Sequence, residues 1–138
     1  NFNDDGRLAT CTGNIVRNLV AGSAVNPDLT RPYGIAAEAD AVISNNLVEG
    51  VPGIGILAGW GPYLRDVAIS GNLIREVDVG IAISVAEGAG RAVVTGNLLS
   101  EVSGHAIIGN QWQDTVSDDL IRDALDFPQL ILDGNTIG

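Results

Sequence analysis

The chain has 138 residues, enough for one domain with a substantial core. Its net charge of −10 argues against a nucleic-acid partner, because phosphate binding needs clustered Lys and Arg. The only cysteine, Cys11, excludes an intrachain disulfide, and no apolar run approaches the ~18 residues of a membrane span. We therefore predict neither a nucleic-acid partner nor a membrane partner.

A short motif recurs five times along the chain and contains a Gly-Asn or Asn-Asn pair. The copies span residues 11–16, 43–48, 69–74, 94–99 and 132–137. They align without gaps on Asn14, Asn46, Asn72, Asn97 and Asn135, which are 32, 26, 25 and 38 residues apart. A motif that persists while its spacing varies indicates a constant set of strands with loops of different length.

Three strands are predicted for each copy of the motif. Before each Asn, apolar residues alternate with polar ones, which is typical of a strand with one buried face. A second apolar strand follows the Asn. A third begins at a Gly-Ile or Gly-His pair and covers residues 34–37, 53–56, 80–83 and 104–107.

The Asn residues themselves suit a tight turn, because Asn tolerates the left-handed conformation and its amide can bond to an identical amide above or below. We therefore predict a structural ladder of the five Asn side chains. The predicted fold is all-β: a right-handed single-stranded parallel β-helix with three short strands per rung and about four to five rungs over residues 1–138.

The last long loop carries helical signals. Ser117 resembles a helix N-cap, Asp118 and Asp119 would lie in the first turn, and Pro128 follows the end. We predict a short helical insertion at residues 113–128.

The Gly-Ile-x-Ile and Gly-Asn-x-Ile patterns resemble the parallel β-helix repeats of the pectate-lyase-like superfamily. The mixture of long and short repeats also resembles an uncharacterised group of twin-arginine-exported bacterial repeat proteins, which would imply a periplasmic or extracellular location. Because the chain starts at Asn1 and stops just after a turn motif, we expect it to be a segment of a longer protein.

The superfamily resemblance implies that sites lie beside the Gly-Ile strand. The positions expected to face outward there are Ala36, Glu38, Gly55, Leu57, Ala82, Ser84, Ala106 and Ile108, of which only one can ionise. This strand therefore supplies no carboxylate pair for acid/base catalysis. The remaining catalytic candidates are His105, with Asp78 or Glu101 nearby, and Arg65, Glu87 and Arg91. No metal site and no cofactor are predicted.

Aromatic residues favour a carbohydrate-binding surface. Trp60 and Trp112 follow the same strand two repeats apart, and sugar rings stack on aromatic faces. The candidate carbohydrate-binding residues are Trp60, Tyr63, Arg65, Asn110, Gln111 and Trp112, with Gln113 also available for hydroxyl groups. The alternative is that these rings only cover the wall of the fold.

Three functions remain open. The first is a non-catalytic exported segment that binds a polysaccharide or oligosaccharide. The second is a polysaccharide lyase or hydrolase whose catalytic cluster lies partly outside this segment. The third is a structural rod that self-associates through its open ends.

Overall fold

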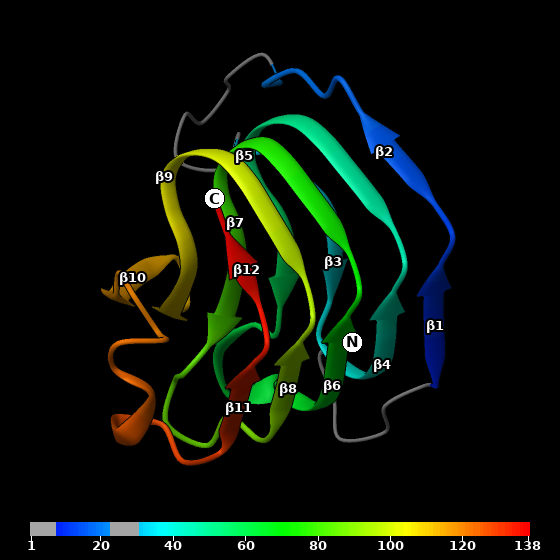
Figure 1. The fold of residues 1–138 in the computed structure, drawn as a ribbon. Coiled ribbons are helices and arrows are strands. Elements are labelled where there is room, and N and C mark those ends of the chain that lie inside the picture. Colours follow the sequence, from blue (N-terminus) through cyan, green and yellow to red (C-terminus); the bar gives the residue numbers. More distant parts are fainter. Residues whose placement is uncertain (1–7, 23–30) are drawn as a thin grey trace.

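The computed structural model describes residues 8–22 and 31–138, and most of these residues lie in strands (Figure 1). The strands are β1 (Ala9–Thr12), β2 (Ile15–Arg17), β3 (Tyr33–Ala37), β4 (Ala39–Ser44), β5 (Leu47–Ala58), β6 (Arg65–Ser70), β7 (Leu73–Ser84), β8 (Ala92–Thr95), β9 (Leu98–Gln111), β10 (Asp114–Ser117), β11 (Leu130–Asp133) and β12 (Thr136–Ile137). Two single-turn 3₁₀ helices, η2 (Gly61–Tyr63) and η3 (Ala124–Asp126), lie between them.

The strands form two sheets. The first has five parallel strands in the order β1-β4-β6-β8-β11. The second has seven strands: β10-β9-β7-β5-β2 form its path, β3 pairs with β5, and β12 pairs with β9. It is a mixed sheet, because β10 runs antiparallel to β9.

This architecture corrects the predicted fold. The right-handed single-stranded parallel β-helix with three short strands per rung is wrong, because the described residues form one five-stranded and one seven-stranded sheet. The second and third strands predicted for each motif are a single strand of 12 residues in β5 and in β7. A register irregularity between Val51 and Ile54 lets β5 bend without ending, so the pairing with β7 continues on both sides of the bend.

The main core lies between the five-stranded sheet and the curved inner face of the long strands (Figure 1). In β4, Ala41 and Ile43 are buried, whereas Val42 between them is 43% exposed. Burial of each large aliphatic side chain contributes about 1.5–3 kcal/mol to stability. The clean alternation expected from the sequence is therefore present in this sheet.

The Asn turns join the two sheets and bond to one another. Asn14, Asn46, Asn72 and Asn97 each donate from the side-chain Nδ2 to the Oδ1 of the next Asn, the last acceptor being Asn135, at 2.9–3.0 Å. The backbone N–H of each donor residue bonds to the same Oδ1. These bonds fix the position of each turn relative to its neighbours.

Beyond the bend, the predicted inward and outward residues are partly exchanged. Gly55 was expected to face outward, but a Cβ at this position would lie 2.7 Å from the core atom Ile74 Cγ2. Ala106 likewise packs against the core. A second apolar cluster, which we call the outer cluster, consists of Ile54, Leu57, Val79, Ala82 and Ile108, and every member is at most 8% exposed.

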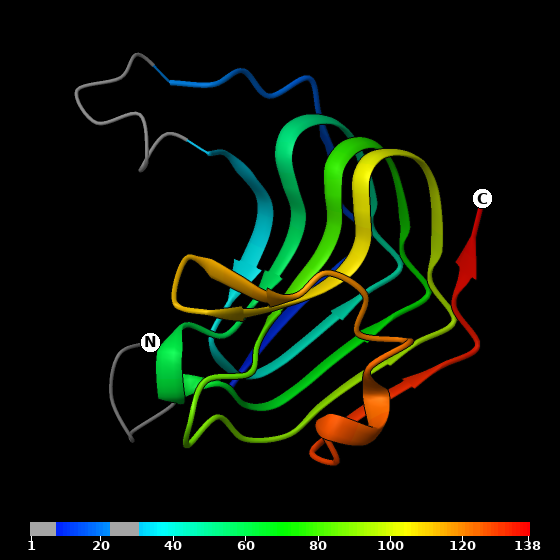
Figure 2. The ribbon, with the colours of Figure 1, turned by 90° about the vertical axis from the view of Figure 1, so that its left-hand side faces the viewer.

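The helical insertion predicted at residues 113–128 is also wrong. The chain forms a β9–β10 hairpin and then a tight turn, and only Ala124–Asp126 is helical. Figure 2 shows this hairpin projecting back across the ends of the long strands. Ser117 is the last residue of β10, and its hydroxyl bonds to the Asp123 carboxylate at 2.8 Å instead of capping a helix. Leu120 is fully buried against the core.

Candidate functional site

A cavity of about 360 Å³ opens over the outer cluster, and we call it the outer cavity. It is lined by Arg31, Tyr33, Ile54, Leu57, Trp60, Asn110, Gln113 and Asp114. Ile54 and Leu57 are buried parts of its wall, whereas the polar groups come mainly from the end of β9 and the hairpin that follows. Its size is at the lower end of the range of about 300–1,000 Å³ typical of ligand pockets.

Aromatic rings form part of this site. The hairpin brings Trp112 back to Trp60, and their ring centroids lie 5.9 Å apart in an edge-to-face arrangement. The Trp112 ring also covers Gly61, where a Cβ would come within 2.5 Å of it. Tyr33, in register with Ile54 of β5, is 41% exposed at the cavity. The site therefore combines flat apolar faces with a solvent opening.

The backbone at Trp112 is unusual for a bulky residue. Gln111 pairs with Asp114, which leaves Trp112 and Gln113 as a two-residue hairpin turn. Trp112 has φ of 56°, a left-handed conformation that normally favours Gly or Asn in such turns. The strained conformation is maintained where the indole packs on Trp60.

Asn110 supplies the most unusual polar group of the site. The residue is 5% exposed, and its backbone is held by pairing with Thr115 and by the bond from the Val85 N–H. Within the described residues, Asn110 Oδ1 is the only buried side-chain N or O atom without a hydrogen-bond partner. An unsatisfied buried acceptor costs about 1–3 kcal/mol, so a group that donates to it would be bound favourably.

The structure brings together only some of the predicted carbohydrate-binding residues. Trp60 and Asn110 line the outer cavity and Trp112 packs beside it. Tyr63, in η2, and Gln111, in the hairpin, are not part of its lining. Arg65 forms a two-bond ion pair with Asp40, at 2.6 and 3.0 Å, and does not line this cavity.

Three lining residues that carry polar groups were not predicted as part of the site: Arg31, Tyr33 and Asp114. Tyr33 immediately precedes a Gly-Ile pair, but the assumed strand began only at the glycine. Asp114 lies in a segment assigned to the helical insertion. If residues 111–114 had been recognised as a hairpin turn, Asp114 would have been predicted to lie beside Asn110.

The catalytic candidates are dispersed. His105 is exposed and lines a separate cavity of about 320 Å³ with Asp118, Asp119 and Arg122, not with the expected Asp78 or Glu101. Glu87 is exposed in a turn. Arg91 pairs with Asp66 at 3.1 Å, and Arg65 pairs with Asp40. These four residues therefore do not form one catalytic group.

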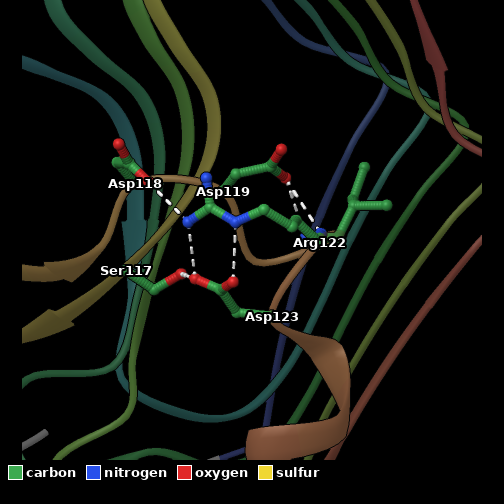
Figure 3. Close-up of polar contacts among 6 residues, drawn as sticks. Ser117, Asp118, Asp119, Arg122 and Asp123 are labelled. Carbon is green, nitrogen blue, oxygen red and sulfur yellow. Dashed lines mark hydrogen bonds and ion pairs between the residues drawn. The ribbon is translucent and has the colours of Figure 1, made fainter.

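The turn beside His105 holds a network of charged side chains (Figure 3). Arg122 donates to Asp118 and to both oxygens of Asp123, at 2.7–2.9 Å. Hydrogen bonds from Arg122 and then from Ser117 lower the pKa of Asp123 from 3.8 to about 2. The bond from Arg122 also lowers the pKa of Asp118, and the carboxylates raise the pKa of Arg122. Because Asp119 Oδ1 accepts from the N–H groups of Ile121 and Arg122, the network stabilises the turn itself.

Comparison with known proteins identifies no relative. The chain has no detectable similarity to a known protein family, to a curated protein or to a solved structure. In the described part of the chain, no helix is long and apolar enough to cross a membrane. Those same residues include no group of three or more His, Cys, Asp or Glu arranged to hold a metal ion. The functional argument therefore depends on the outer cavity.

Proposed function

We propose that the outer cavity binds a saccharide and that this part of the protein acts as a carbohydrate-binding module. The observation that carries the proposal is Asn110 Oδ1, a buried acceptor without a partner among the described residues, at a cavity that also presents aromatic rings. A sugar offers a hydroxyl group for the amide and an apolar ring face for stacking.

The proposal holds for either orientation of the Asn110 amide. Exchanging its oxygen and nitrogen would place an unpartnered donor where the unpartnered acceptor now lies. A hydroxyl group donates and accepts, so it satisfies both arrangements. Gln113 and Asp114 line the same cavity and offer further groups to the neighbouring hydroxyls.

The lining favours binding over hydrolysis. Glycosidases that follow the common mechanism place two carboxyl groups about 5–9.5 Å apart across the bond that is cleaved. Asp114 is the only carboxylate among the described residues that line the outer cavity. We therefore favour the binding function over the hydrolase alternative.

The test is a titration with cellotriose, mannotriose, maltotriose and galactotriose, followed by tryptophan fluorescence. Both Trp residues of the chain lie at the site, so a bound sugar should change the emission. We expect saturable binding of at least one trisaccharide. In Asn110→Ala the affinity should fall about 10- to 100-fold, corresponding to a hydrogen bond worth about 1–3 kcal/mol.

Two variants control this experiment. Gln129→Ala, on a different groove of the molecule, should bind as the wild type does. Trp112→Phe leaves Trp60 as the only indole and keeps a ring against it, so its emission should still respond. An unchanged affinity in both Asn110→Ala and Trp60→Ala would show that the sugar binds elsewhere, and no response to any glycan would overturn the proposal.

A further inference from the structure

The two charged residues among the described lining of the outer cavity, Arg31 and Asp114, differ in their ion pairing. Arg31 is the only basic residue among the described lining residues, and its guanidinium donates to Asp78 Oδ2 at 2.8 Å. The Asp114 carboxylate has no hydrogen bond or ion pair with any described side chain, and the residue is exposed at the hairpin. Arg31 is thus balanced by Asp78, whereas the Asp114 charge is not balanced.

This charge distribution affects the ligands that the cavity can hold. The carboxylate of a uronic acid would share the outer cavity with the Asp114 carboxylate, and two like charges that lie close together repel each other. The formal net charge of −10 adds a longer-range repulsion. A neutral sugar experiences neither effect, and a carboxylate or an amide oxygen at residue 114 can accept from its hydroxyl groups.

We infer that the outer cavity selects neutral saccharides and rejects uronic acids, with Asp114 as the residue that determines this specificity. The inference rests on the proposed saccharide-binding function and adds the class of sugar to it. Asn110 supplies affinity for a hydroxyl group of either class, whereas Asp114 discriminates by charge.

The test uses matched pairs that differ only in oxidation at C6: cellotriose and triglucuronate, mannotriose and trimannuronate, and galactotriose and trigalacturonate. The affinity of each is measured by tryptophan fluorescence at low and at high salt. In the pair that binds, we expect the neutral trimer to bind at least tenfold more tightly at low salt. The difference should become smaller at high salt, because added ions screen the repulsion.

Asp114→Asn is the variant that isolates the charge. It should raise the affinity for the acidic trimer at least threefold and change the affinity for the neutral trimer less than twofold. Asp126→Asn removes the same charge from an exposed position outside the cavity lining and controls for the change in net charge.

The outcomes separate the two proposals. If neither the six trimers nor maltotriose bind, both the saccharide-binding function and its specificity are overturned. If an acidic trimer binds as tightly as its neutral counterpart or more tightly, the saccharide-binding function stands and the charge selection is wrong. If Asp126→Asn acts as strongly as Asp114→Asn, the role of Asp114 is wrong and only net charge matters.

Discussion

Asn72 and Asn110 are similarly buried, at 1% and 5% exposed, but their amides have opposite environments. Asn72 Oδ1 accepts two bonds from Asn46, and its Nδ2 donates to Ile43 O and Asn97 Oδ1. Asn110 Oδ1 has no partner among the described residues. Buried amides that stabilise a fold usually have partners for their polar atoms, and this contrast is the basis of the binding role proposed for Asn110.

The largest effect on stability should come from Asn72→Ala, which removes the amide whose oxygen and nitrogen both have hydrogen-bond partners. The substitution removes the acceptor for two Asn46 donors and the two bonds that Asn72 Nδ2 donates to Asn97 Oδ1 and Ile43 O. The backbone N–H of residue 72 also loses its bond if the neighbouring amide shifts. We expect the free energy of unfolding to fall by about 3 kcal/mol or more, measured by urea denaturation.

Ser70→Ala is the control for this measurement, because Ser70 lies on the outer face of β6 and is only partly buried. Its effect should stay within about 0.5 kcal/mol. Ser84 is unsuitable as a control: it was expected to face solvent, but it is 2% exposed and donates to Gly61 O at 2.7 Å. Equal losses for Asn72→Ala and Ser70→Ala would contradict the importance of the Asn bonds.

The charged turn of Figure 3 should respond to pH, whereas the Asn amides carry no titratable group. The folded-state pKa of Asp123 is about 2, below its ordinary value of 3.8. Its stabilising contribution is therefore complete above about pH 4 and is lost as the pH falls towards 2. Urea denaturation at pH 5, 4, 3 and 2 should show a smaller loss of stability in Asp123→Asn than in the wild type. Parallel curves for the two proteins would contradict the lowered pKa.

The sequence predicted the repeated parts of the molecule better than the irregular ones. The five-fold recurrence placed each Asn, and the alternation in Ala41 and Ile43 placed the inner face of the five-stranded sheet. Both features repeat, so each copy provides independent evidence for the same conformation. The predicted number of strands was still wrong. The long strands bend at Gly50 and Glu76, and in the sequence such a bend resembles the end of one strand and the start of the next.

The site depends on features that occur once. Trp112 at a left-handed turn position has no propensity signal, and Ser117 and Asp118 gave a helical signal that the β9–β10 pairing overrides. Asn110 was a candidate from the sequence and lines the outer cavity, but its lack of a partner is visible only in the structure. Sequence reasoning therefore suggested four residues at or beside the outer cavity and missed the hairpin that brings them together.

A smaller effect is expected at the bend of the long strands, where Asn18, Gly50, Glu76 and Glu101 all have positive φ. Glu101 has φ of 52°. For a residue with a side chain, this left-handed conformation is less favourable by about 1 kcal/mol or more, whereas Gly adopts it without this penalty. Glu101→Gly should raise the free energy of unfolding by about 0.5–1 kcal/mol, as measured in urea. Glu87→Gly, at an exposed turn position whose φ is not positive, should give no gain. A loss in both variants would indicate that the entropy of the unfolded chain outweighs the strain.

The smallest effect on stability should come from Asn110→Ala, although the side chain is almost as buried as that of Asn72. No hydrogen bond of its side chain with the described residues is lost, and an unsatisfied oxygen is removed, so lost packing is offset. We expect the free energy of unfolding to change by less than about 1 kcal/mol in either direction. A loss similar to that in Asn72→Ala would mean that a water molecule satisfies the amide within the fold. That result would remove the support for a ligand at Asn110. Unchanged stability together with reduced sugar affinity would show that Asn110 acts in binding alone.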